Sequence, residues 1–176
     1  VYVSIFMGAF GTARKTWITF QNVAILLLIS LALTPAFRMR FWNIGGEGQF
    51  IMGAICASAA AHKLGPVLPQ PLVVLVMALC GILGGGLYGL IVALLKVRYN
   101  TNETLLTLML NYIALYMIKF LREGPWRDPT STAFPQIAMF GDNARLDNVF
   151  GVHAGWILAL VLVALVFVYT RYTKHG

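Results

Sequence analysis

The sequence has little charge for its length. Only 11% of its 176 residues are Asp, Glu, Lys or Arg, whereas 59% are hydrophobic. Ordinary soluble domains have about 25% charged and about 45–50% apolar residues. This composition excludes a typical water-soluble globule and predicts a protein that resides in a membrane.

The sequence also lacks the side-chain patterns of an enzyme or a metal site. His62, His153 and His175 are far apart and match no ligand spacing, so we expect no metal. Cys56 and Cys80 each lie in an apolar run and are interpreted as small buried hydrophobic residues. No phosphate-binding GxxxxGK[ST], GxSxG or HExxH motif is present, so we expect neither an enzyme nor a cofactor held by this chain.

Basic residues outnumber acidic ones, 13 Lys and Arg against 6 Asp and Glu, which gives a net charge of +7. They occur in short groups between apolar runs, whereas a nucleic-acid binder gathers them on one polar face. The pattern therefore predicts a polytopic membrane protein and no nucleic-acid partner.

Long apolar runs are abundant. A helix needs about 20 mostly apolar residues to cross the hydrocarbon core. Residues 1–11 form a possible sixth, partial helix, and we predict an all-α polytopic protein with about five transmembrane helices in a single domain, 1–176. The five expected spans are 17–37, 41–61, 71–95, 105–121 and 151–170.

The basic residues also predict the orientation in the membrane. One side collects six of them and the other side three, apart from those in the long connector 122–150. The richer side is expected to be cytoplasmic, which makes 122–150 external and the C-terminus cytoplasmic. The six are Arg38, Arg40, Lys96, Arg98, Arg171 and Lys174, and the three are Arg14, Lys15 and Lys63.

The run 41–54, FWNIGGEGQFIMGA, is unusual because it places a carboxylate in an apolar segment. Three glycines, Gly45, Gly46 and Gly48, weaken a helix there, so we predict a discontinuous helix with freed backbone amides. A charged residue at membrane depth tends to face a cavity or a partner, which makes Glu47 a candidate for a solute pathway. The alternative is that Glu47 lies near the inner surface and pairs with Arg38 or Arg40.

Two further helices have features that a plain anchor does not need. Gly81, Gly85 and Gly89 recur every fourth residue, a stripe of small residues that lets helix backbones approach closely. Asn111 lies in the middle of the run LLTLMLNYIALYMIKFL, where it either bonds a neighbouring helix or lines a solute route. Thr101 or Asn102 is expected to cap the start of that helix.

Three motifs in order carry a family resemblance. FWNIGGEGQFIMGA (41–54) resembles the NIG-x-EGQ segment of permease subunits in ABC importers for nucleosides and simple sugars, within the wider ribose and branched-chain amino-acid permease group. NETLLTLMLNYIALY (102–116) resembles their NE-x-x-x-TLMLNYIA helix, and GPWRDP (124–129) resembles the start of their external loop. The resemblance covers essentially the whole chain.

This resemblance implies a dimeric pathway with a second permease subunit, cytoplasmic ATPase subunits that hold ATP and Mg, a periplasmic or lipoprotein receptor, surrounding membrane lipid, and the bacterial inner membrane as location. Nucleosides are the favoured solutes. The motif positions expected near the route are Asn43, Glu47, Gln49 and Asn111, with Tyr88 as a weaker candidate for stacking on a base or sugar.

The resemblance ends early. The chain begins inside an apolar stretch and stops at RYTKHG, where these permeases have the segment that docks on the ATPase. We therefore expect a domain that is incomplete at both ends. Two other classes are weighed against the importer: an ion-coupled secondary transporter or channel acting through Glu47, and a non-transporting scaffold that binds a partner through Trp126 and Phe134.

Overall fold

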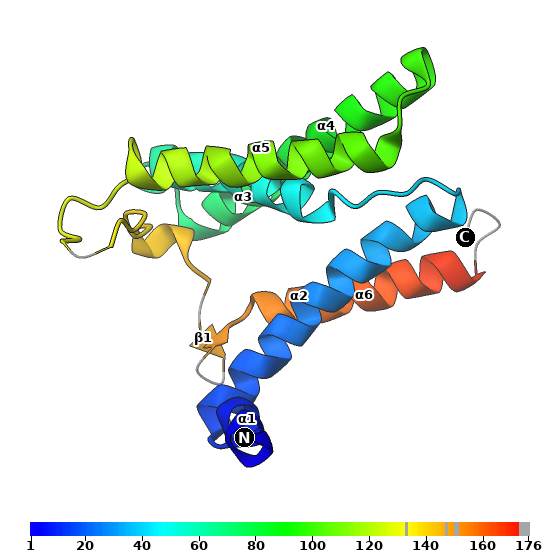
Figure 1. Cartoon of the computed structure of the whole chain (residues 1–176). Helices are drawn as coiled ribbons and strands as arrows, with labels where there is room; N and C mark the ends of the chain where they lie inside the picture. The colour runs from blue at the N-terminus through cyan, green and yellow to red at the C-terminus, as the bar shows by residue number, and fades with distance from the viewer. Residues whose placement is uncertain (133, 147, 150–151, 173–176) are drawn as a thin grey trace. The chain divides into compact units, whose positions relative to one another are not determined.

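The computed structural model describes residues 1–132, 134–146, 148–149 and 152–172. Its helices are α1 (Tyr2–Phe10), α2 (Ala13–Arg38), α3 (Gly46–Leu64), α4 (Gln70–Tyr99), α5 (Glu103–Glu123) and α6 (Gly155–Tyr172), with the 3-10 turn η1 (Asp142–Ala144) and the two-residue strands β1 (Asn148–Val149) and β2 (Val152–His153). The described chain is thus helical, as expected, apart from this short antiparallel pair (Figure 1).

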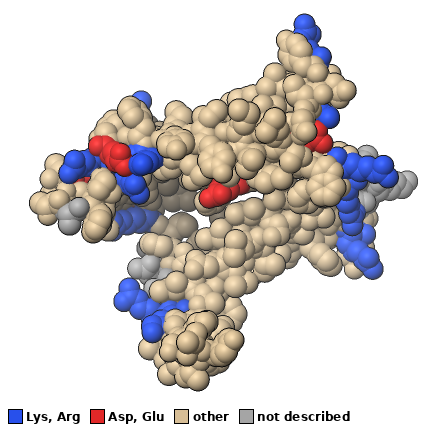
Figure 2. All heavy atoms as spheres, viewed as in Figure 1, with Lys and Arg blue, Asp and Glu red and all other residues tan. Residues whose placement is uncertain are grey.

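Four of the described helices, α2, α4, α5 and α6, are long and apolar enough to cross a membrane. The expected fifth span, α3, is not among them. Its 19 residues include the polar residues Glu47, Gln49, His62 and Lys63, and many of the others are Gly or Ala, which makes the helix less apolar than the other four. The small side chains lie in a helix that packs on α4 and α5. In Figure 2 most of the visible surface is uncharged, Lys and Arg gather in a few separate groups, and one acidic group lies amid the uncharged surface.

The chain divides into two compact units, Val1–Phe41 with Leu146–Gly176, and Trp42–Arg145. The expectation of one domain stays a prediction. In the first unit α2 packs along α6, and α1 contacts α2 (Figure 1). The expected partial helix at 1–11 is present as α1. Lys174, which entered the charge count, lies outside the described residues.

In the second unit α3 packs extensively on α4 and also on α5, so three helices lie side by side (Figure 1). The seam between α3 and α4 is built from main chain. An ideal Cβ on Gly53 would lie 2.9 Å from the Gly81 carbonyl oxygen, and one on Gly85 would lie 3.0 Å from the Gln49 carbonyl oxygen. Small residues therefore let these two backbones touch.

The turn between α4 and α5 is tight. Asn100 adopts the left-handed conformation (φ 49°) and ends α4, while the Asn102 side chain accepts a hydrogen bond from the Leu105 amide and begins α5. Lys96 and Glu103 pair across the turn at 2.8 Å. Asn102 is one of the two caps that the sequence predicted. The helix α4 extends past its predicted end at 95, and its last turn contains the basic residues Lys96 and Arg98.

The connector after α5 folds back on the ends of α3 and α4. Arg127 forms an isolated antiparallel β-bridge with Ile137, and the Gln70 side chain donates a hydrogen bond to the Arg145 carbonyl at 2.8 Å. Ala61, Val73 and Ala144 form a small buried cluster beneath it. His62 lies between two aromatic rings, with centroids 5.5 Å from Trp126 and 5.0 Å from Phe140.

Candidate functional site

The segment before α3 is held against α5 by buried polar groups. Asn43 is only 7% exposed, and its Oδ1 accepts a hydrogen bond from the Gly45 amide at 2.9 Å. The Ile44 amide donates to the Thr107 hydroxyl at 3.2 Å, and that hydroxyl donates to the Thr104 carbonyl. These bonds satisfy backbone groups that an extended segment would otherwise leave unpaired.

The glycines mark the start of a helix. Residues 41–45 have no regular structure, Gly45 is the N-cap of α3, and Gly46 is its first residue. The expected interruption inside a helix over 41–61 is therefore corrected: the helix begins at Gly46. The physical reason is close contact with α5, because an ideal Cβ on Gly45 would lie 2.9 Å from the Thr107 carbonyl oxygen and one on Gly48 would lie 2.8 Å from Asn111 Oδ1.

Among the described residues no side-chain hydrogen bond caps the N-terminus of α3. The first amides of a helix have no partner within the helix, and the helix dipole adds partial positive charge at this end. The start of α3 therefore offers hydrogen-bond donors to the groups beside it.

Glu47 and Asn111 meet at this point. Asn111 donates from Nδ2 to Glu47 Oε2 at 3.2 Å. Asn111 follows Glu103, the first residue of α5, by eight residues, a rise of about 12 Å at 1.5 Å per residue. Glu47, on α3, therefore lies beside the middle of α5 and away from the end of α5 that carries the Lys96–Glu103 pair.

The two atoms of the Asn111 amide have different surroundings. A carboxylate only accepts hydrogen bonds, so Nδ2 faces Glu47. Oδ1 is buried and has no hydrogen-bond partner among the described residues. The backbone of Gly48 lies against it, which leaves no room for a side chain at that position.

Tyr88 on α4 contacts α5 next to Asn111. It is 9% exposed, and its hydroxyl donates to the Leu110 carbonyl at 2.7 Å. The hydroxyl thus bonds α4 to α5, and the expected stacking on a base or sugar stays a prediction. Since Leu110 precedes Asn111, the bond ties the position of the Asn111 turn to α4.

Gln49 links α3 to the glycine stripe on α4. An ideal Cβ on Gly89 would lie 3.1 Å from Gln49 Nε2, so the Gln49 side chain occupies the space above this glycine. Gly81 is less crowded, with 3.6 Å from its ideal Cβ to the Gly53 carbonyl oxygen. Gly84, which the stripe did not include, is tighter because Cys56 Sγ lies directly over it.

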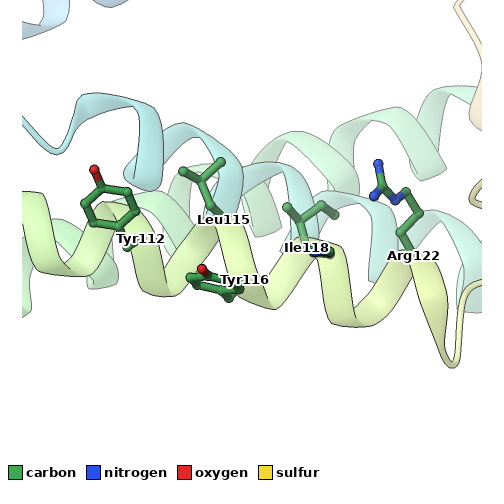
Figure 3. Close-up of a pocket in the computed structure, with 6 residues that line it drawn as sticks. Tyr112, Leu115, Tyr116, Ile118 and Arg122 are labelled. Carbon is green, nitrogen blue, oxygen red and sulfur yellow. The ribbon is translucent and has the colours of Figure 1, made fainter.

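A groove of about 390 Å³ runs along α5 beyond Asn111 (Figure 3). The groove extends from Tyr112, the residue after Asn111, to Arg122 in the final turn of α5. All of its lining residues belong to this helix: Tyr112, Leu115, Tyr116, Ile118, Lys119 and Arg122.

Together these groups suit a polar solute better than a metal ion. Within the described residues no three His, Cys, Asp or Glu side chains are placed to hold a metal. Around the start of α3 the chain instead presents a carboxylate, an amide and helix-terminal N–H groups. Thr107 is part of this arrangement, and its position one turn before Asn111 on an apolar helix is the signal by which the sequence could have indicated it.

Comparison with known proteins gives a consistent family. The family described as "Branched-chain amino acid transport system / permease component" matches residues 18–176. The chain is 30% identical to a guanosine ABC transporter permease protein of Bacillus subtilis (98% of this chain, 51% of the relative). It is 28% identical to a nucleoside ABC transporter permease protein of Lactococcus lactis (98% and 50%) and 29% identical to a glucose ABC transporter permease protein of Haloferax volcanii (86% and 42%).

The chain spans about half the length of the curated relatives it matches. No solved structure matches it significantly.

Proposed function

Since the chain belongs to the family of branched-chain amino acid transport system permease components, we propose that it forms part of the solute route of an ATP-driven importer. The resemblance inferred from the three sequence motifs is confirmed by this family. Membership makes the chain a component of a multi-pass membrane permease and not an enzyme, and the family has no cofactor of its own.

The proposed partners follow from this role. A permease component without a nucleotide-binding motif depends on separate ATPase subunits, on which ATP and Mg act, and on a receptor that delivers the solute. A second permease subunit completes the route in the proposed assembly. These partners are proposed for the whole protein of which the chain spans half.

Nucleosides are the proposed solutes, and sugars are the second choice. Two of the relatives are named for guanosine or nucleoside transport and a third for glucose. Both kinds of solute carry several hydroxyl groups and no net charge. A carboxylate acceptor beside helix-terminal N–H donors is suited to such groups.

The proposed topology follows the basic residues. With α3 as a crossing helix, Arg38, Lys96 and Arg171 fall on one side of the membrane, at the ends of α2, α4 and α6. That side is proposed to be cytoplasmic, which places the connector 122–150 outside.

One observation carries the proposed route: the hydrogen bond between Asn111 and Glu47 at the uncapped start of α3. Transporters place solute sites at helix ends inside the membrane, where backbone groups are free to bind. The carboxylate of Glu47 is exposed in the described structure, so it has capacity to accept bonds beyond the one from Asn111.

The test is uptake by the full-length protein with its ATPase and receptor in proteoliposomes, with guanosine, a pentose, glucose and a branched-chain amino acid compared. We expect ATP-dependent uptake of guanosine, lost in Glu47→Ala and strongly reduced in Asn111→Ala. Leu105→Ala, an exposed change on the same helix, is the matched control and should keep uptake.

Two outcomes would overturn the proposal in different ways. Uptake that persists without ATP or the ATPase contradicts the importer and favours ion coupling through Glu47. ATP-dependent uptake that both substitutions leave unchanged keeps the importer and contradicts the proposed site.

A further inference from the structure

A second pocket lies outside the proposed solute route, in the unit formed by α1, α2 and α6. Its volume is about 410 Å³, and it lies between the C-terminal ends of α2 and α6. Each helix contributes one arginine, one threonine and one large apolar residue. The lining is Leu31, Thr34 and Arg38 from α2 and Phe167, Thr170 and Arg171 from α6.

The two arginines meet because α2 and α6 are parallel. Near the helix starts, the rings of Trp17 and Trp156 are 5.4 Å apart. At the other end, Arg38 is the last residue of α2 and Arg171 is the next to last of α6. Two parallel helices of this kind reach the same membrane interface and bring both guanidinium groups to it.

No acidic side chain lies in the described part of the pocket's own unit. Neither Arg38 nor Arg171 forms an ion pair within the described residues. The segments 1–41 and 146–176 contain one acidic residue, Asp147, which precedes α6 in the chain and so is remote in sequence from the arginine end. Two like charges that share a pocket repel each other, and a bound anion relieves that repulsion.

The pocket also has an apolar part. Leu31 and Phe167 lie one to two helical turns before the arginines, on the side towards the middle of the helices. The two threonine hydroxyls donate to carbonyls of their own helices, Thr34 to Ser30 and Thr170 to Phe167. The two guanidinium groups are thus the donors of this lining that have no ion pair among the described residues, and Leu31 and Phe167 supply its apolar part.

We propose that this pocket binds an anionic phospholipid, with its phosphate between Arg38 and Arg171 and an acyl chain along Leu31 and Phe167. Guanidinium groups bind phosphate oxygens in bidentate fashion, and basic pockets between transmembrane helices bind anionic head groups. A soluble phosphate would use the arginines alone. The inference needs only the membrane residence of the family and is independent of the proposed solute.

A simpler role for the arginines is possible in physical terms, namely to balance the partial negative charge at the two helix ends. That role predicts stabilisation in every lipid. A phospholipid site predicts stabilisation that depends on the head group, so the comparison of lipids separates the two.

The experiment measures the unfolding midpoint of the purified full-length protein in detergent during titration with palmitoyl-oleoyl phosphatidylglycerol or phosphatidylcholine. The test variant is Arg38→Gln with Arg171→Gln. The matched control, Arg14→Gln with Lys15→Gln, removes two positive charges at the opposite end of α2. A third arm replaces the lipid with glycerol phosphate, which has no acyl chain.

We expect phosphatidylglycerol to raise the midpoint more than phosphatidylcholine, and the test variant to need at least about tenfold more of it for half of the effect. The control variant should respond like the wild type, and glycerol phosphate should have little effect. An equal response in the test variant and the wild type, or equal stabilisation by both lipids, overturns the proposal. So does stabilisation by glycerol phosphate alone, which indicates a site for free phosphate.

If the glutamine variant does not fold, Arg38→Lys with Arg171→Lys takes its place. It keeps both charges but removes the bidentate contact of the guanidinium groups, so it is expected to prefer phosphatidylglycerol still and to need more of it for half of the effect. A folded lysine variant that responds like the wild type contradicts the bidentate phosphate contact.

Discussion

Asn111 on α5 and Gly48 on α3 are in direct contact: an ideal Cβ at position 48 would lie 2.8 Å from Asn111 Oδ1 and 2.9 Å from its Cα. The Nδ2 atom of the same side chain donates a hydrogen bond to Glu47 Oε2. One asparagine therefore fixes both the distance between the two helices and the orientation of the carboxylate.

Gly48→Ala is expected to destabilise the protein by about 1–3 kcal/mol, because overpacking at a close contact forces the two helices apart. Gly86→Ala is the matched control, since nothing lies within 4 Å of its ideal Cβ and alanine favours a helix over glycine. Thermal unfolding of both variants in one detergent checks the difference. Equal midpoints would contradict the close packing of α3 on α5.

Tyr88→Phe removes the hydroxyl that donates to the Leu110 carbonyl and leaves the ring in place. A lost hydrogen bond of this kind costs about 0.5–1.5 kcal/mol. If Tyr88 positions the Asn111 turn, the variant should also weaken solute binding. Tyr112→Phe, which changes a 57% exposed tyrosine on α5, should affect stability less. Binding and unfolding measured on the same preparations separate positioning from stability, and unchanged binding contradicts the positioning role.

Asn102→Ala removes the side chain that accepts from the Leu105 amide at the start of α5. Loss of such a cap costs about 1 kcal/mol. Asn102→Ser, which can still cap, should recover most of it. Amide hydrogen exchange over residues 103–107 is the measurement. Faster exchange confined to the alanine variant is expected, and equal exchange in both variants argues against the cap.

The connector is expected to respond to acid through Asp128. The Thr130 hydroxyl and amide donate to Asp128 Oδ1 at 2.7 and 2.8 Å, and these bonds hold the pKa of Asp128 below its ordinary value of 3.8. A lowered pKa means that the turn is stabilised above the unfolded pKa and loses this stabilisation as the pH falls through the folded value.

Amide exchange at Thr130 and Ser131, followed from neutral to acid pH, tests this. Protection beyond the normal pH dependence of exchange should fall only in the acid range. Thr130→Val should make this fall smaller, because it removes the hydroxyl bond and leaves the amide bond in place. A pH dependence that the substitution leaves unaltered would show that the Thr130 hydroxyl does not hold Asp128.

The sequence predicted the helices well where one physical signal dominates. Of the five spans predicted from apolar length, four correspond to helices that are long and apolar enough to cross a membrane, and Asn102 is one of the two caps predicted from residue type. The start of α3 was placed five residues too early, because Phe41, Trp42 and Ile44 extend the apolar run without being helical. That segment is held by the local bond from the Gly45 amide to Asn43 and by the bond from the Ile44 amide to Thr107, which is more than sixty residues away in the chain.

The candidate site was harder to predict for the same reason. Glu47 and Asn111 were singled out separately, each as a polar group in an apolar run. That they bind each other depends on the register of α3 against α5, which close glycine contacts determine and which no local pattern encodes. Tyr88 shows the limit most clearly, since a tyrosine beside a glycine stripe fits an exposed role and a buried one equally well.

The backbone contacts between α3 and α4 limit how this protein can adapt. Every replacement of Gly53 adds atoms to a surface that has no space for them, so this seam cannot be repacked by single, gradual changes. A side chain added on one of these helices therefore needs matching space on the other, so the two helices are constrained to change together.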